Sequence, residues 1–392
     1  MKKIYLDYNA TTPLDPRVLE AMMPYLGDGF GNPSSIHSFG MKGKGALDRA
    51  REQLAGLIGA SPREIFFTSG GSESNNFAIK GAAYGLKEKG SHLVTTAVEH
   101  ESVLETFRFL ERDGFRVTYL GVDSSGIIDF DELSDSISDD TLLVSCIFAN
   151  NETGAVMPVN EVARIVKEKG AIFHTDAVQA AGKIDIDVKQ IPADILTISA
   201  HKFYGPKGAG ALYVRDGINK KIPLRPLIHG GGQERGARSG TENVPAIAGM
   251  GMAAQIALRE MKEDEMRIKP LRDGLWERLS SIIGGVKLNG DIDRILWNTL
   301  NVFIDGVSGD SLSMALDLEG VAVSTGSACS EGKVDPSHVL TAMGLSRAEA
   351  ASSVRFSLGR FTGEEDIESA AEIIPRAVER IRKTRGRNSA AI

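Results

Sequence analysis

Between about residue 45 and residue 214, short apolar runs alternate with segments whose apolar residues repeat at helical spacing. In the first such segment Leu47, Ala50, Leu54 and Ile58 recur every three or four residues, which indicates one face of a helix. We expect a helix at 72–80 and strands at 65–68, 93–96, 117–120, 142–148, 172–174, 195–198 and 211–214. Alternating strands and helices predict an α/β fold built on a largely parallel, doubly wound sheet.

Polar residues follow most of these apolar runs. They are found at 70–73, 99–100, 150–152 and 199–202, and at Asp176 and Gln179. In an open α/β sheet the ligand binds outside the carboxyl ends of the strands. The run at 142–148 is almost wholly apolar, which is typical of a strand covered by helices on both faces. The sequence therefore predicts a ligand site along one edge of a buried sheet.

The pattern changes after about residue 258. A charged stretch at 259–267 leads into mixed strand and helix patterns, and a final helical repeat runs from Ile367 to Ile381. We therefore expect a large domain at 15–258 and a smaller α+β domain made of residues 1–14 and 259–392.

The bulk chemistry of the chain argues against several classes of protein. The 392 residues are 42% hydrophobic and 25% charged, as in an ordinary globular protein, and the net charge of −7 argues against a nucleic-acid partner. No stretch approaches the roughly 18 apolar residues that a membrane span needs, and Asp7 interrupts any N-terminal signal core. The two cysteines, Cys146 and Cys329, supply neither a disulfide framework nor a metal site. We expect a cytoplasmic protein without a bound metal.

The first strand end has the form of a phosphate site. Gly70, Gly71, Ser72 and Glu73 follow the strand at 65–68 and open a helix. Such a turn points free backbone N–H groups and the positive end of the helix at one place, which suits a phosphate. The alternative is a plain glycine-rich connection in which Ser72 caps the helix.

Two later strand ends carry residues that suit the same cofactor. Asp176 ends a strand, where a carboxylate needs a partner such as a protonated ring nitrogen, although a helix N-cap is the alternative. Lys202 has apolar and aromatic neighbours, which can make a lysine nucleophilic toward carbonyls. A phosphate cradle, an acid and a lysine are the set that pyridoxal 5'-phosphate (PLP) requires. His100 opens onto the same edge, either to stack on a ring and move protons or as a structural histidine.

Ordered motifs along most of the chain resemble those of the cysteine desulfurases, which belong to the class V aminotransferase-like group of fold type I PLP-dependent enzymes. The matching segments lie at 6–13, 31–35, 99–100, 150–154, 174–179, 199–202, 238–241, 326–329 and 355–360. The resemblance implies a mostly parallel sheet in a large PLP-binding domain, a smaller α+β domain and a homodimer.

The resemblance also implies a role for each residue of the cofactor site. Lys202 forms a Schiff base with PLP, Asp176 pairs with the pyridine nitrogen, and His100 stacks on the ring as a catalytic residue. Gln179 bonds the ring hydroxyl. The residues implied to hold the phosphate are Gly71, Ser72, Ser199, His201 and, from the second subunit, Thr241.

Three residues are implied for the substrate, which is L-cysteine. Asn151 contacts both the cofactor and the substrate carboxylate, and Arg355 offers that carboxylate a bidentate grip. Cys329 takes the sulfur as a persulfide, L-alanine is released, and the sulfur passes to an acceptor protein such as an iron–sulfur scaffold. The segment around Cys329 is small, polar and rich in glycine, which indicates a loop, whereas Cys146 lies in an apolar run and is expected to be a buried hydrophobe.

Other activities remain open on the same residues. A selenocysteine lyase, an aminotransferase or a β-elimination enzyme uses the same cofactor, and a non-enzymatic sulfur-transfer scaffold is a further alternative. An aminotransferase does not need the cysteine at position 329. The segments 31–35 and 240–243 and the short C-terminal tail most resemble the nitrogenase-maturation and iron–sulfur assembly branch.

Overall fold

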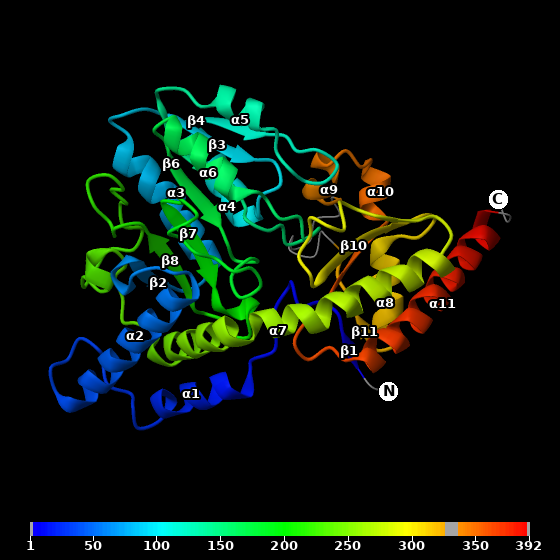
Figure 1. Ribbon diagram of the computed structural model, residues 1–392, viewed down its shortest axis with the longest axis horizontal. Helices are drawn as coiled ribbons and strands as arrows, with labels where there is room; N and C mark the ends of the chain where they lie inside the picture. Colours follow the sequence, from blue (N-terminus) through cyan, green and yellow to red (C-terminus); the bar gives the residue numbers. More distant parts are fainter. Residues whose placement is uncertain (1–2, 326–335, 390–392) are drawn as a thin grey trace.

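The computed structural model describes residues 3–325 and 336–389 and is built around a seven-stranded sheet (Figure 1). Its strands, in the order β2-β8-β7-β6-β5-β3-β4, are β2 (Ile65–Thr68), β8 (Gly210–Val214), β7 (Ile195–Ser199), β6 (Ile172–Asp176), β5 (Thr141–Ser145), β3 (His92–Thr96) and β4 (Arg116–Leu120). The strands from β7 to β4 are parallel, and β8 runs antiparallel to both of its neighbours. The predicted α/β class with a mostly parallel sheet is confirmed.

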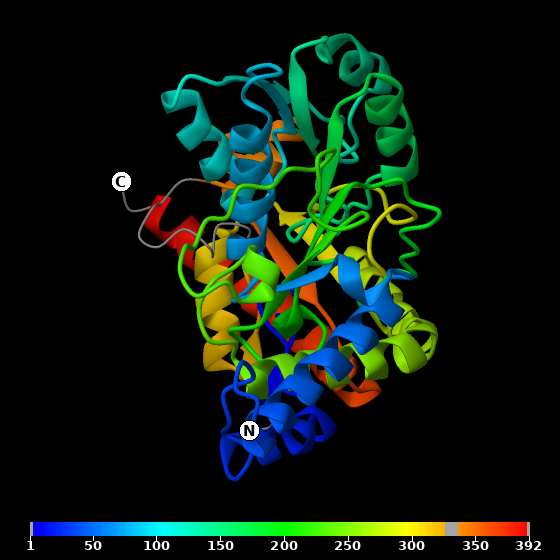
Figure 2. The same ribbon diagram turned by 90° about the vertical axis from the view of Figure 1, so that its left-hand side faces the viewer.

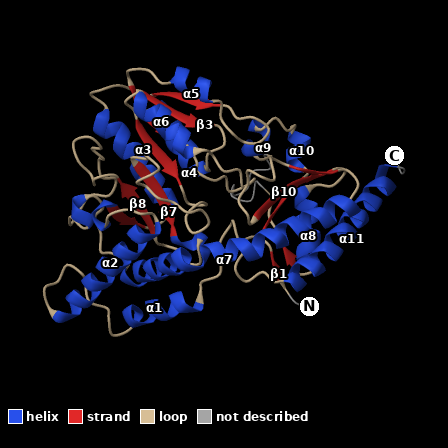
Figure 3. Cartoon of the chain, viewed as in Figure 1, coloured by secondary structure: helices blue, strands red, loops and turns tan. Residues whose placement is uncertain are grey.

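Helices cover both faces of this sheet (Figure 3). On one face lie α3 (Gly71–Leu86) and α4 (Glu101–Arg112), and on the other lie α2 (Ser38–Leu57), α5 (Phe130–Ser136), α6 (Val159–Glu168) and the first half of α7 (Val244–Ile282). Neighbouring strand residues alternate between the two faces of the sheet: Phe66 packs with α3, and Phe67 packs on the opposite face. Because both faces are buried, the strands are almost continuously apolar, as expected.

A second core surrounds a three-stranded antiparallel sheet of β9 (Val286–Leu288), β10 (Thr299–Ile304) and β12 (Ser353–Ser357). It is covered by α8 (Gly309–Leu318), α11 (Glu364–Ser389) and the second half of α7, and α9 (His338–Ala342) and α10 (Arg347–Ala351) follow beside it. The predicted boundary near residue 258 falls inside α7, whose Ala257 faces the first core and whose Ile268 faces the second. The division into two domains stays a prediction. Among the described helices, none is long and apolar enough to cross a membrane.

The N-terminal segment connects the second core to the large sheet. Its strand β1 (Ile4–Tyr5) pairs in parallel with β11 (Val321–Ala322), and Asp7 then bridges to Ser357 of β12. Farther on, the Thr12 amide donates to the His201 carbonyl at 3.0 Å, before α1 (Pro16–Leu26) begins. The segment from residue 3 to residue 15 therefore runs past the carboxyl ends of the strands.

One predicted strand is longer than the structure allows. The strand expected at 142–148 ends at Ser145 as β5. The amides of Cys146 and Phe148 still donate to two carbonyl oxygens of β6, those of His174 and Asp176, at 3.1 and 3.0 Å. On the other side β3 ends at Thr96, and the Ile147 amide donates to the Glu99 side chain at 2.7 Å instead of to a strand backbone. The apolar pattern at 146–148 indicates burial, and these residues are indeed buried although the regular strand has ended.

Candidate active site

A cavity of about 280 Å³ opens at the carboxyl ends of the central strands. Most of the predicted site residues line it together: Gly71, Ser72, His100, Asn151, Asp176, Gln179, Ser199, His201, Lys202 and Arg355. Thr241 is exposed and does not line the cavity, and Cys329 lies outside the described residues. Thus residues separated by nearly 300 positions in the chain converge on one pocket, while two of the predicted residues are not placed in it.

The turn predicted to bind phosphate leaves its helix N-terminus uncapped. The residue that precedes α3 is Gly70, which has no side chain to cap the helix, so the first N–H groups remain available to a ligand. Ser72 is the second residue of the helix, so the interpretation of Ser72 as its N-cap is wrong. A Cβ atom on Gly71 would lie 2.9 Å from Val178 Cγ2 and 3.6 Å from Ser199 Cβ. The absence of a side chain at Gly71 therefore keeps this end of the cavity open.

Asp176 is buried at the end of β6, facing the cavity. Its Oδ1 accepts from the Val178 amide at 2.9 Å, and its Oδ2 accepts from Asn75 Nδ2 at 2.7 Å. Asn75 also donates to Ser102 Oγ at 2.8 Å. No regular helix starts at Asp176, so its interpretation as a helix N-cap is wrong. The two hydrogen bonds fix the carboxylate and leave it as an acceptor for a cationic group in the cavity.

His100 is the N-cap of α4, and this role fixes its tautomer. Its Nδ1 accepts from the Ser102 amide at 3.1 Å and lies 2.9 Å from Ser102 Oγ. Burial lowers the pKa of His100, the charge of Lys202 lowers it further, and Asp176 acts in the opposite direction. The ring is therefore neutral at pH 7, with its proton on Nε2, and can lie against a flat ligand without adding charge.

Lys202 lies in a single 3₁₀ turn (Ala200–Lys202) directly after β7. Its Nζ donates to the carbonyl oxygens of Asn9 and Ala10 at 2.6 and 2.7 Å. The same N-terminal segment is tied to the lysine turn again, because the Tyr204 amide donates to Thr12 Oγ1 at 2.8 Å. These contacts hold the amine of Lys202 at the mouth of the cavity.

His201 precedes Lys202 in the same 3₁₀ turn. Its Nδ1 is 3.2 Å from Thr11 Oγ1. Burial lowers the pKa of His201 to about 4, and the nearby charge of Lys202 adds to this effect. His201 can therefore contribute a neutral hydrogen bond to a phosphate, whose charge is met by the N-terminus of α3.

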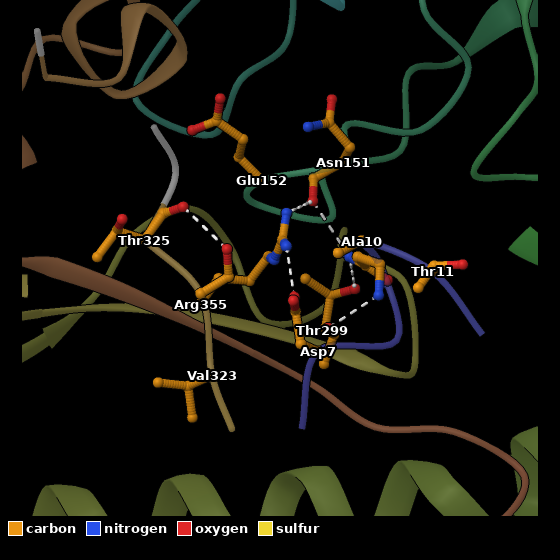
Figure 4. A network of polar contacts seen from close by, with 12 residues as sticks. Asp7, Ala10, Thr11, Asn151, Glu152, Thr299, Val323, Thr325 and Arg355 are labelled. Carbon is orange, nitrogen blue, oxygen red and sulfur yellow. Dashed lines mark hydrogen bonds and ion pairs between the residues drawn. The ribbon is translucent and has the colours of Figure 1, made fainter. Parts of the chain in front are cut away.

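Arg355 reaches the cavity from β12 in the second core (Figure 4). Its Nη2 pairs with Asp7 Oδ1 at 2.7 Å, and its Nη1 donates to the carbonyl oxygen of Asn151 at 2.8 Å. The Nε of Arg355 is buried and has no hydrogen-bond partner among the described residues. An unpaired buried donor on a guanidinium is costly, so this atom marks a place for an anionic acceptor.

A family model described as aminotransferase class-V matches residues 4–369. The chain belongs to the aminotransferase class-V family. The cysteine desulfurase IscS of Clostridium botulinum is 48% identical over 97% of this chain and 96% of that protein. Among solved structures, a NifS-like protein matches with a TM-score of 0.90 and 40% identity over 96% of this chain and 99% of its own. A structure described as SspA in complex with cysteine matches with a TM-score of 0.81 and 41% identity over 92% and 100%. The resemblance inferred from the motifs is confirmed.

Sequence reasoning missed several residues that shape the site of this family member. Asn9 lies within a motif that matched the family, yet no role was predicted for it. Its backbone oxygen accepts from Lys202 Nζ and from Gln179 Nε2, and its Nδ2 donates to the Asn151 carbonyl at 3.2 Å. Asn75 and Asp7 were missed as well. Only the polar character of Asn9 and Asp7 in an otherwise apolar N-terminal run was available as a signal.

Cys146 has the position expected of it. Its side chain is fully buried beside the large sheet, and burial raises the pKa of the thiol well above its usual value, with Glu99 adding to the effect. A thiol held in this state is a poor nucleophile.

Proposed function

We propose that this protein is a PLP-dependent cysteine desulfurase, which converts L-cysteine to L-alanine and transfers the sulfur to Cys329 as a persulfide. The observation that carries the proposal is that Lys202, Asp176 and Arg355 line one cavity. The similarity to proteins named as cysteine desulfurases over nearly the whole chain supports it. The persulfide then passes to an acceptor protein for iron–sulfur cluster assembly. A free thiol that must stay reduced between turnovers fits a cytoplasmic location.

The described residues fit PLP at three points. The open N-terminus of α3 with Gly71 and Ser72 suits its phosphate, the buried carboxylate of Asp176 suits its ring nitrogen, and Lys202 supplies the amine for a covalent link. When bound, PLP draws electrons from the substrate Cα, so that bonds next to this atom can break. His100 lines the same cavity and offers a neutral ring face.

Arg355 orients the substrate through its carboxylate. The guanidinium is already held in place by Asp7 and by the Asn151 carbonyl, while its Nε lacks a partner. A carboxylate that binds Nε and one Nη forms the two parallel bonds that arginine favours. Because the guanidinium is fixed before substrate arrives, the substrate Cα is presented to Lys202 in one orientation.

Lys202 moves the proton. Once substrate occupies the cavity, the amine of Lys202 takes the proton from the substrate Cα and holds it next to the reacting atoms. The carbonyl groups of Asn9 and Ala10 can accept hydrogen bonds from the ammonium that forms. Positioned proton transfer of this kind contributes about 10²–10⁴-fold to a rate.

The sulfur step needs a thiolate at position 329. The thiolate attacks the substrate sulfur, the bond between this sulfur and the substrate Cβ breaks, and Cβ takes up a proton to give alanine. Cysteine and enzyme thiol thus become alanine and enzyme persulfide without an outside oxidant. Ser324 and Arg355 exchange backbone hydrogen bonds of 2.7 and 3.2 Å, so the last described residues before position 329 lie beside the carboxylate anchor.

Arg355→Lys should raise the KM for L-cysteine about tenfold or more and change PLP content little. Lysine keeps the charge but loses the planar fork, and a hydrogen bond to a charged group contributes about 1.5–3 kcal/mol. The measurement is alanine formed from L-cysteine by the purified, PLP-loaded protein. An unchanged KM would exclude Arg355 as the anchor, whereas no alanine from the wild-type protein would exclude the proposed function itself.

A second copy of the chain is proposed to cover an exposed apolar patch on α1, the following loop and the start of α2 (Figures 1 and 2). The patch consists of Leu19, Met23, Leu26, Phe30, Ile36, Phe39 and Met41. Ile36 is 97% exposed and Phe30 is 74% exposed, which is unusual for a surface that stays in water. Thr241 is also exposed, just before α7, and Gly249 of α7 lies against Met22 of α1. This arrangement supports a homodimer in which Thr241 completes the partner's phosphate site.

The double variant Phe30→Glu/Ile36→Glu should sediment as a monomer and bind PLP more weakly than the wild-type dimer. Charges within a buried apolar interface remain unpaired, and the monomer lacks the partner's Thr241. Leu318→Glu is the matched control, because Leu318 is 83% exposed and belongs to α8, which packs in the second core, away from α1 (Figure 1). A wild-type monomer with full PLP affinity, or a dimeric double variant, would contradict this interface.

A further inference from the structure

Lys183 is a buried lysine that the proposed reaction does not use. It is 7% exposed, does not line the cavity and follows Gln179 by four residues. Its backbone carbonyl is fixed by Trp297 Nε1 at 2.9 Å. Its Nζ donates to Gln179 Oε1 at 2.6 Å and to Asn9 Oδ1 at 3.4 Å. Among the described residues, no carboxylate lies within ion-pair distance of this amine.

The surroundings of Lys183 suit a neutral amine. The pKa of Lys183 is lowered to about 7, mainly by burial and in addition by the charges of Lys202 and Arg355. A neutral amine has two N–H groups, and the described residues offer two acceptors, both of them amide oxygens. A buried ammonium without a counter-charge would be costly at this position. Lys183 can thus act as a hydrogen-bond donor without adding a full charge beneath the cofactor site.

The contacts of Lys183 set the orientation of the Gln179 carboxamide. Gln179 Nε2 donates to the Asn9 carbonyl oxygen at 2.8 Å, and this oxygen can only accept. The amide oxygen at the other end of the carboxamide accepts from Lys183. With its oxygen engaged and one N–H bonded, Gln179 keeps one N–H for a group in the cavity that it lines. The carboxamide therefore faces the cavity as a donor.

We propose that Lys183 is a positioning residue that holds the Gln179 carboxamide by its oxygen, so that Gln179 donates to the ring-hydroxyl oxygen of the cofactor. This inference rests on the proposed function, because it assumes that PLP binds in this cavity. Asn9 joins the arrangement to the reaction, since its carbonyl oxygen also accepts from Lys202 Nζ. A single chain of contacts thus runs from Lys183 through Gln179 and Asn9 to the catalytic lysine.

Binding to the apoprotein tests this role separately from turnover. The probes are pyridoxamine 5'-phosphate, which cannot form a Schiff base with Lys202, and its 3-deoxy analogue, which lacks the ring hydroxyl. Wild-type apoprotein should bind the hydroxyl-bearing probe about tenfold or more tightly than the 3-deoxy analogue, because only the first offers a ring oxygen to the Gln179 N–H. Lys183→Met should lose most of this preference, because the Gln179 oxygen then lacks its donor and the carboxamide is held only by its contact with the Asn9 carbonyl.

The results with these variants separate the explanations. An equal loss of affinity for both probes in Lys183→Met would mean a merely structural role and would overturn the inference, as would an unchanged preference. When Gln179→Ala is already present, adding Lys183→Met should not change the ratio of the two probe affinities, because the lysine acts through the Gln179 side chain. If Lys183→Met does not fold, Lys183→Gln keeps a polar group but is too short to hold Gln179, and it should show the same loss. Failure of wild-type apoprotein to bind either probe would instead contradict the proposed function.

Discussion

Lys202→Ala should abolish alanine formation while the protein stays folded and still binds PLP loosely. The variant loses both the covalent link and the group that moves the Cα proton, so the rate falls by at least the ~10²–10⁴-fold typical of a positioned proton-transfer group. Among the described residues that line the cavity, no other lysine can replace it. The phosphate turn at Gly71 and the carboxylate of Asp176 remain, which accounts for the residual binding.

The measurement combines the rate of alanine formation with the absorbance spectrum of the purified protein. Lys207→Ala is the matched control, since Lys207 is exposed five residues farther along and should tolerate the change. If Lys202→Ala kept the absorbance of covalently bound PLP and full activity, the assignment of the cofactor lysine would be wrong. Lys183 could not explain such a result easily, because it lies beneath Gln179 and does not line the cavity.

Much of the active site could be predicted because its residues follow strand ends. The apolar runs that form β2, β6 and β7 were readable, and the polar residues directly after them meet at one edge of the sheet by the geometry of parallel strands. Gly71, Asp176 and Lys202 are all of this kind. Local pattern was sufficient for them, because the sheet brings strand ends together.

The residues that were missed depend on contacts across large sequence separations. Asn9 meets Lys202 across 193 positions and Asn298 across 289 positions, and no periodic pattern reports such a contact. Asp7 pairs with Arg355 only because β1 and β12 belong to neighbouring sheets. Lys183 follows Gln179 by four residues, but a lysine at this spacing is usually solvated, so only its burial distinguishes it.

The boundary between the predicted domains shows the same limit. A charged stretch at 259–267 indicated a change of domain, yet it lies on the surface of one continuous helix, α7. Charged residues on one face of a helix indicate that this face is exposed to water, and they do not indicate that the helix ends there. Along α7 the contacts change from the first core at Ala257 to the second core at Ile268, close to the boundary predicted at residue 258.

Cys329→Ser should leave folding, PLP binding and cysteine binding intact and remove sulfur transfer. Serine has nearly the same shape as cysteine, so Lys202, Asp176 and Arg355 keep their surroundings. Its hydroxyl does not ionise near neutral pH, whereas a thiol can, and only the ionised group attacks sulfur readily. The variant should bind cysteine, change the absorbance of the cofactor and then stall without releasing alanine.

A mass spectrum after one turnover provides the direct measurement. In the wild-type protein the peptide that carries Cys329 should be heavier by one sulfur, and in Cys329→Ser this gain should be absent. Cys146→Ser is the control, because the Cys146 thiol is fully buried and burial raises its pKa, so this change should affect stability and leave sulfur transfer intact. If Cys329→Ser made alanine from cysteine at the wild-type rate, the enzyme thiol would have no part in breaking the carbon–sulfur bond. A β-elimination enzyme on the same cofactor would then be the better account of this cavity.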